Sequence, residues 1–169
     1  MTERNRSLFY ASLVVMACSI LLTSGCLQKH RVLERYKGEA ARNLLLNRPW
    51  IDEYPAKPEQ RFMAYVFTDE SVGIHDKADS AYRHLVEIFL LKVSAEKIGY
   101  LFPHDRRKAD TAYKLERIQG DKYFNLKVTI DQDPQAGGKS YIYFSNTEWN
   151  VKNQGSLPES VKPLSRLAR

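Results

Sequence analysis

Two His-Asp pairs are the residues of this sequence best suited to acid–base or metal chemistry. They are His75-Asp76 and His104-Asp105, and His84 lies between them. Histidine titrates near neutral pH, and a neighbouring carboxylate can orient its ring or help to bind a metal ion. The spacing matches no compact metal motif, such as two histidines one helical turn apart. His104 follows a proline and precedes Asp105 and three basic residues, which is typical of an exposed loop. The sequence therefore assigns no catalytic residue and no metal site.

The segment DQDPQAGG, residues 131–138, alternates acidic residues as the start of a calcium-binding loop does. The later positions do not fit, because the sixth is Ala136 where an EF-hand needs glycine, and the twelfth is Ile142 where it needs glutamate. Asp-Pro and Gly-Gly are instead the chemistry of a turn between strands. No serine or cysteine nucleophile stands in a recognisable setting, so we expect no cofactor and no enzyme active site.

Tyrosines offer a different kind of site near the end of the chain. Tyr141 and Tyr143 alternate with Ile142 and Phe144, so they lie on one face of a predicted strand. Exposed tyrosines on a sheet could stack on sugar rings or dock a partner. The alternative is a central strand that is covered on both faces. Both readings stay open from the sequence, and Tyr141 and Tyr143 are a candidate binding face.

The elements that would position these residues are mostly strands. Residues 61–68 (RFMAYVFT) predict a strand buried on both faces, and residues 123–130 (YFNLKVTI) alternate apolar and polar side chains with the period of a half-buried strand. Residues 111–118 and 140–145 show the same alternation, and QGDK between 118 and 123 predicts a hairpin. The pattern predicts a mainly β domain, a small antiparallel sandwich or barrel of five to seven strands.

Residues 78–98 are ambiguous. Tyr82, Leu85 and Phe89 fit one helix face, and no proline or glycine interrupts the run. The same residues also fit two strands, HLVEIFLLKV and IGYLFP, around a short turn. We favour the hairpin because the neighbouring segments are strand-like and consecutive strands tend to pair. The alternative is an α+β fold in which residues 78–98 are helical.

The segments on either side of the predicted β domain (residues 61–151) do not show the pattern of strands. Apolar residues at helical spacing predict an N-terminal helix over residues 31–47, although Gly38 weakens it. Three prolines in residues 48–60 predict an extended connector. Together, residues 26–60 form a lead-in to the domain, and residues 152–169 form a basic tail.

The first 25 residues have the features of a secretory signal peptide. Arg4 and Arg6 precede an apolar run from residue 8 to residue 22. Fifteen helical residues span roughly 22 Å, which is short for a hydrocarbon core of about 30 Å. A positive start, a short apolar middle and small residues at its end are typical of a signal that is removed.

The end of this segment, LLTSGC, resembles the lipobox of bacterial lipoproteins, with small Ser24 and Gly25 directly before Cys26. Thr23 departs from the aliphatic residue that the family most often has there. The resemblance implies cleavage between Gly25 and Cys26 and acylation at Cys26, with chains such as palmitate. It also implies a periplasm-facing lipoprotein, and Leu27, in place of an aspartate, favours the outer membrane.

Composition and charge limit the classes of partner that the sequence predicts. Cys26 is the only cysteine left after cleavage, so an exported domain of 144 residues has no internal disulfide and depends on packing. The net charge of +6 comes from the two flanks, whereas a nucleic-acid protein more often carries a basic stripe on its folded domain. Basic flanks suit anionic lipid or wall polymers.

These observations predict a lipid-anchored protein of the cell envelope that acts as a non-enzymatic binding or assembly module. Its expected partners are the membrane, through the anchor, and an envelope protein or wall polymer, but no nucleic acid. One alternative is a small β-barrel carrier of a lipid or other apolar ligand. Another is an envelope enzyme that uses the His-Asp pairs, which requires His75, His84 or His104 to meet in one pocket.

Overall fold

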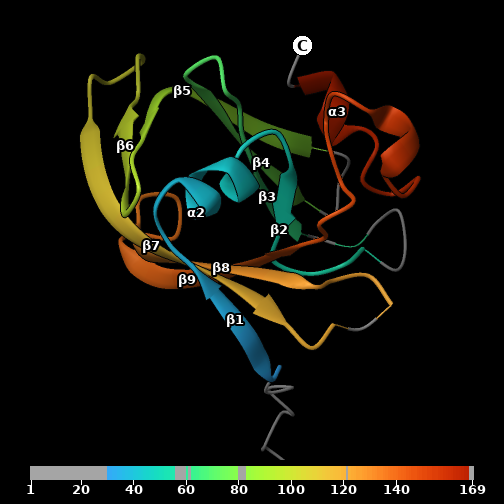
Figure 1. Cartoon of the computed structure of the whole chain (residues 1–169). Coiled ribbons are helices and arrows are strands. Elements are labelled where there is room, and N and C mark those ends of the chain that lie inside the picture. The colour runs from blue at the N-terminus through green and yellow to red at the C-terminus, as the bar shows by residue number, and fades with distance from the viewer. Residues whose placement is uncertain (1–29, 56–59, 61, 80–82, 121, 168–169) are drawn as a thin grey trace, which may run out of the picture. The chain divides into compact units, whose positions relative to one another are not determined.

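Antiparallel strands make up most of the folded chain (Figure 1). The computed structural model describes residues 30–55, 60, 62–79, 83–120 and 122–167. The strands are β1 (Val32–Tyr36), β2 (Pro49–Ile51), β3 (Phe62–Phe67), β4 (Val72–Asp79), β5 (Arg83–Val93), β6 (Lys97–Leu101), β7 (Lys108–Ile118), β8 (Leu126–Asp133) and β9 (Lys139–Ser145). The helices are α2 (Gly38–Leu45), a 3-10 turn η1 (Gln154–Ser156) and α3 (Leu164–Leu167).

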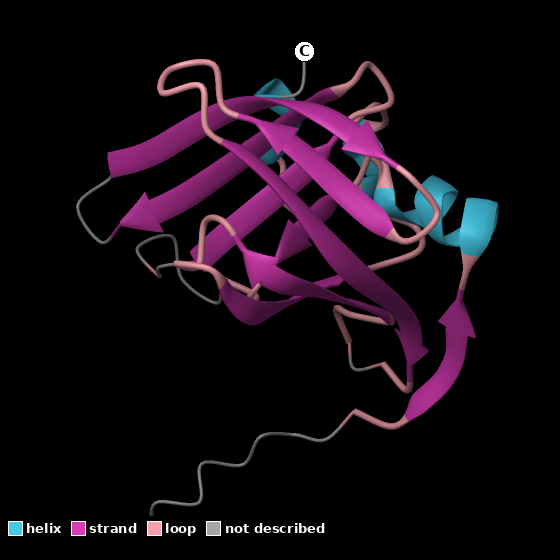
Figure 2. Ribbon diagram, turned by 90° about the vertical axis from the view of Figure 1, so that its left-hand side faces the viewer, coloured by secondary structure: helices cyan, strands magenta, loops and turns pink. Residues whose placement is uncertain are grey.

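Strands β2 to β9 close into an eight-stranded antiparallel barrel. Each strand pairs with the next along the chain, the pairing of β7 with β8 continues the wall, and Ile51 of β2 meets Phe144 of β9 to close it. β1 is an additional strand. The long β7 pairs with β6 along the first half of one edge and with β1 along the second half (Figures 1 and 2).

The barrel interior is filled with aromatic and aliphatic side chains. In β8, every second residue from Leu126 to Ile130 points inward and is fully buried, which is the alternation expected of a barrel strand. α2 adds to this core through Ala41 and Leu45, and the Trp50 indole donates a 2.9 Å hydrogen bond to the Leu45 carbonyl. The fully buried rings are those of Trp50, Tyr65, Phe67, Phe89, Phe102 and Tyr143.

A second apolar core lies on the outer face of β2, β3 and β4. Ile51, Val66 and Ile74 point outward from these strands and are buried. The segment after β9 covers them, with Trp149 and Val161 among its buried residues. This packing explains why β3 has no polar face, since one side lies in the barrel and the other lies beneath the C-terminal segment.

The prediction of a mainly β fold is confirmed, but the barrel contains more strands than the five to seven expected. The N-terminal helix predicted over residues 31–47 is not seen: β1 occupies its first half, and the eight-residue α2 follows. Gly38 has a φ of +59° and turns the chain between the two, so the helical periodicity does not continue as one helix.

The hairpin interpretation of residues 84–103 is also confirmed, because β5 and β6 pair around a short turn, and the α+β alternative is wrong. Two barrel strands were not predicted. β2 lies within the proline-rich segment and has three residues, and β4 carries polar residues on its inner face at one end of the barrel. Arg31–Arg169 forms one compact unit, and no helix in the described part of the chain is long and apolar enough to cross a membrane.

Candidate functional site

A carboxylate lies buried inside the barrel. Asp133 ends β8 and is fully buried. The register between β8 and β9 shifts between Ile130 and Asp133, and Gln132 adopts a left-handed φ of +52°. This is a β-bulge, in which one extra residue changes the face to which the following side chain points. The bulge therefore places Asp133 on the inner face of the wall.

Two tyrosines donate hydrogen bonds to this carboxylate. The Tyr65 hydroxyl donates to Oδ1 at 2.6 Å, and the Tyr143 hydroxyl donates to Oδ2 at 2.7 Å. The backbone N–H of Gln135 also donates to Oδ1, at 2.9 Å, which fixes the turn that follows. Hydrogen bonds to an ionised group are stronger than those between neutral groups. The cluster joins β3, β8 and β9 at one point inside the barrel.

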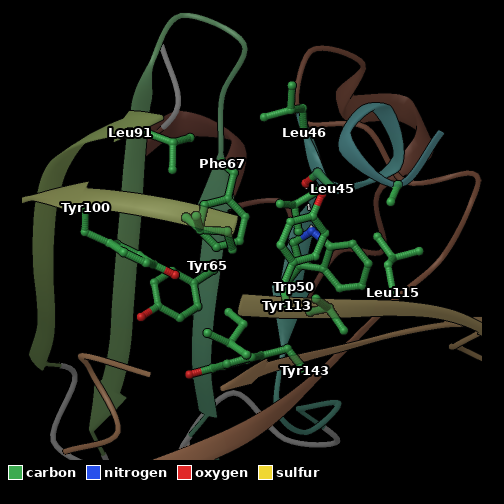
Figure 3. Close-up of a cluster of buried hydrophobic side chains, with 14 of the residues drawn as sticks. Leu45, Leu46, Trp50, Tyr65, Phe67, Leu91, Tyr100, Tyr113, Leu115 and Tyr143 are labelled. Carbon is green, nitrogen blue, oxygen red and sulfur yellow. Dashed lines mark hydrogen bonds between the residues drawn. The ribbon is translucent and has the colours of Figure 1, made fainter. Parts of the chain in front are cut away.

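Tyr100 completes the cluster from β6. Its hydroxyl is buried and has no hydrogen-bond partner in the described part of the chain. Burial, and after it the negative charge of Asp133, raises the pKa of Tyr100 and Tyr143 well above the usual value. Figure 3 shows the hydroxyls of Tyr65, Tyr100 and Tyr143 on the same side of the cluster. The raised pKa favours the protonated form of all three side chains, and Tyr65 and Tyr143 use their hydroxyl protons as hydrogen-bond donors to Asp133.

Charged residues lie at the barrel mouth, defined here as the end where β5 and β7 begin. Glu87 of β5 accepts a short hydrogen bond from the Gln135 side chain. His104 Nδ1 lies 3.3 Å and Arg107 Nη2 lies 3.7 Å from Glu87 Oε1. The Arg107 guanidinium also stacks 4.2 Å above the centre of the Phe102 ring. These contacts bind the connection between β6 and β7 to β5.

The histidines that the sequence singled out have different surroundings. His75 is buried inside the barrel opposite Glu87, and its ring lies 4.7 Å from that of Tyr65. His104 is exposed in a connection, as expected, and the His84 side chain lies outside the described residues. Among the described residues, no three His, Cys, Asp or Glu side chains are placed to hold a metal ion.

The two tyrosines of the candidate binding face do not lie on an exposed surface. Tyr143 is fully buried in the interior, and Tyr141 is half-buried, its hydroxyl donating to Asp52 at 3.2 Å. Both rings therefore lie on the inner face of β9, but Ile142 on its outer face is 42% exposed, so the strand is not covered on both faces. Gly25 and Cys26, the predicted cleavage and lipid-attachment residues, lie outside the described part, so their roles stay predictions.

Among the described residues, the most exposed row of large apolar side chains is on β5. Val86, Ile88 and Leu90 point outward at alternate positions, with exposed fractions of 41%, 57% and 50%. We call these three residues the β5 row. In the pairing register, Val72 of β4 and Leu101 of β6 lie on either side of Leu90. The row therefore extends the apolar outer face of the barrel beyond the part that the C-terminal segment covers.

No known protein family, curated protein or solved structure matches this chain. The site must therefore be judged on its own geometry. In the buried cluster, hydrogen bonds from neighbouring groups pair with the Asp133 carboxylate inside a filled interior. In the β5 row, by contrast, large apolar side chains are in contact with water. Sequence analysis missed both, although the alternation of Val86, Ile88 and Leu90 with Glu87 and Phe89 was visible in the hairpin interpretation.

Proposed function

We propose that this chain is a lipid-anchored, non-enzymatic binding module of the bacterial cell envelope, and that it binds through the outer surface around the β5 row. The observation that carries the proposal is the contrast between the two sides of β5. Inside, Phe89 and Leu91 pack in a filled core, and outside, Ile88 and Leu90 are half exposed or more. Apolar patches of this kind mark interaction sites in soluble domains.

The anchor belongs to the proposal through the resemblance of LLTSGC to a lipobox. Val32, where β1 begins, is only six positions after Cys26, a distance of at most about 20 Å along an extended chain. β1 lies at the bottom of Figure 1 and β5 lies at the top. Acylation at Cys26 would therefore keep β1, and the barrel that it joins, near a membrane.

The proposal is tested by measuring how accessible the β5 row is in the cell. After acylation of Cys26, a cysteine introduced by Ile88→Cys is the only free thiol, because Cys18 is removed with the signal. Its reaction with a bulky maleimide should be at least tenfold slower in isolated envelopes than in the purified protein. Lys139→Cys, exposed at the start of β9, serves as the control and should react equally in both. Equal rates at position 88 would contradict the proposal.

A second candidate is a carrier of an apolar ligand, because closed antiparallel barrels are a fold that such carriers use. A bound ligand would have to displace interior rings such as those of Tyr65 and Phe89, whose centroids lie 6.1 Å apart. Trp50 lies inside the barrel and reports on this directly. In a Trp149→Phe variant, which leaves Trp50 as the only tryptophan of the chain, oleic acid should leave the emission unchanged if the protein is a binding module, and a saturable shift would favour the carrier.

A further inference from the structure

One edge of β5 is open beside the β5 row. The Leu91 N–H donates to the Ser71 carbonyl at 2.7 Å, so the odd-numbered residues of β5 direct their backbone groups toward β4. The even-numbered residues direct theirs toward β6, whose last paired residue is Leu101, opposite Leu90. The backbone groups of Val86 and Ile88 therefore face the stretch of this edge where no described strand is paired.

The chain turns away from this edge for a physical reason. The residue that would pair with Ile88 is Pro103, which has no N–H to offer. The Phe102 N–H instead donates to the Arg107 carbonyl at 2.9 Å, which closes the turn into β7. An exposed strand edge of this kind is a template for another strand. Here it carries exposed apolar side chains as well.

The charges beside the open edge indicate what such a strand would contain. Arg106, in the connection that follows β6, and Lys108, the first residue of β7, are both exposed, and neither forms an ion pair in the described part of the chain. The acidic groups nearby, Glu87 and Asp105, already contact Arg107 and His104. Arg106 and Lys108 therefore offer positive charge on this side of the barrel, which an acidic partner would complement.

We propose that an extended segment of a partner protein, apolar at alternate positions and carrying acidic residues, adds as a strand to the open edge of β5. Main-chain hydrogen bonds to Val86 and Ile88 would provide affinity, and the β5 row and the two cations would provide selectivity. This inference deepens the proposed function and rests on it. An amphipathic helix, a lipid surface and a second copy of this chain are the other possible occupants.

A proline substitution distinguishes the addition of a partner strand at the edge of β5 from the packing of a partner on the exposed face of β5. The Ile88 N–H points away from β4, so Ile88→Pro removes a donor to the partner without breaking the β4–β5 ladder, as prolines at strand edges do. Ile88→Ala keeps the donor and shortens the side chain. A photocrosslinking residue at position 86 in the native cell then measures occupancy. Adduct yield should fall at least tenfold in Ile88→Pro and no more than about threefold in Ile88→Ala, and Arg106→Glu with Lys108→Glu should lower it as well.

A crosslinker at Leu33, which is exposed on β1, controls for nonspecific capture by any apolar side chain at an edge strand. Hydrogen exchange of the purified complex gives a second readout, in which the Val86 and Ile88 amides should slow at least tenfold. Should Ile88→Pro fail to fold, Val86→Pro with the crosslinker at position 90 replaces it. An equal loss of adduct yield in the proline and alanine variants would overturn strand addition. So would an adduct with a lipid or with a second copy of this chain. Protection of Ile88→Cys would still support the proposed function in each of those cases.

A lipid surface is tested separately with the acylated full-length protein in vesicles. Protein-free vesicles of phosphatidylglycerol and phosphatidylethanolamine are then added as a second population. Strand addition to a protein predicts no bridging between the two populations. Bridging that Ile88→Asp abolishes would show that the β5 row binds membranes, and the inference would be wrong.

Discussion

Gly73 on β4 lies directly opposite Phe89 on β5, and the phenyl ring occupies the space that a side chain at position 73 would need. A Cβ added at Gly73 would lie 2.0 Å from a ring carbon of Phe89. Gly73 therefore allows a large ring to fill the barrel at this level. A polar strand with a glycine near its start is a weak strand signal, but here the glycine leaves the space that the Phe89 ring fills.

Gly73→Ala should destabilise the protein by about 1–3 kcal/mol, because overpacking forces side chains or backbone to move. Urea unfolding measures the loss. The cost should be smaller by at least ~1 kcal/mol in a Phe89→Leu background, since leucine leaves room for the methyl group. The same cost in both backgrounds would show that the contact between the two residues is not the cause.

Tyr143, which donates a hydrogen bond to Asp133, can be compared with Tyr100, a buried tyrosine of the same cluster whose hydroxyl has no partner among the described residues. Tyr143→Phe should cost about 1.5–3 kcal/mol, the range for a hydrogen bond to a charged group. Tyr100→Phe should change stability by less than about 0.5 kcal/mol, because its buried hydroxyl has no hydrogen-bond partner among the described residues. Urea unfolding of both variants checks this, and equal losses would contradict the hydrogen-bonding scheme around Asp133.

Trp149 tests the role of the C-terminal segment. Its side chain is buried against the outer face of the barrel, and its ring centroid lies 5.9 Å from that of Phe124. Trp149→Ala should destabilise the fold by about 3–5 kcal/mol, because it opens a cavity over β2 and β3. Glu148→Ala, at the exposed neighbouring position, should have little effect on the midpoint of urea unfolding. A mild effect of Trp149→Ala would mean that this segment does not belong to the folded core.

The sequence predicts the strands whose side chains alternate, as in β8, or are apolar on both faces, as in β3. It does not predict β1, β2 and β4, whose local patterns are not typical of strands. β8 was correctly predicted because Leu126, Val128 and Ile130 face a core while the residues between them do not. β4 was not recognised because its inner face carries His75 near the polar barrel mouth. β1 was taken for helix because pairing with β7 overrides the local pattern.

Candidate sites were harder to predict because each depends on contacts between distant residues. The sequence indicates only that Asp133 is part of a turn. No pattern in the neighbouring residues predicts the bulge at Gln132 that directs the Asp133 side chain toward Tyr65. The open edge at Ile88 depends on where β6 ends, which is a property of the pairing and not of β5 itself. Periodicity shows which face of a strand is apolar, but not whether another segment covers it.

Cys26→Ser tests the anchor independently of the barrel. Serine cannot form the thioether, so the variant should remain as a precursor or move to the soluble fraction, whereas the wild type stays with the membrane. Fractionation followed by mass measurement of the mature protein checks both outcomes. Cys18→Ser is the control, because it lies in the segment that the proposed cleavage removes, and it should behave as the wild type. A Cys26→Ser protein that still needs detergent would refute the anchor.

Glu116 should make stability depend on acidic pH. It is buried on the outer face of β7, where Arg35 contacts it at 2.8 Å and Lys127 contacts it from β8. Burial alone would raise the pKa of Glu116. The hydrogen bonds and charges of Lys127 and Arg35 together lower it by more than burial raises it, so the net pKa lies below the usual 4.5. The folded state therefore favours the ionised carboxylate.

A carboxyl group with a lowered folded-state pKa contributes stability that is fully present above its unfolded-state pKa and is lost as the pH falls through the folded-state value. Glu116→Gln should be less stable than the wild type at pH 7, by about 1–3 kcal/mol. The difference should shrink below about pH 4.5 and disappear at lower pH. Urea unfolding between pH 3 and pH 7 measures it. Lys127→Ala, which removes the less exposed of the two cations, should reduce the pH dependence more than Arg35→Ala does. A gap between Glu116→Gln and the wild type that stays constant over this range would show that the charge of Glu116 does not stabilise the barrel.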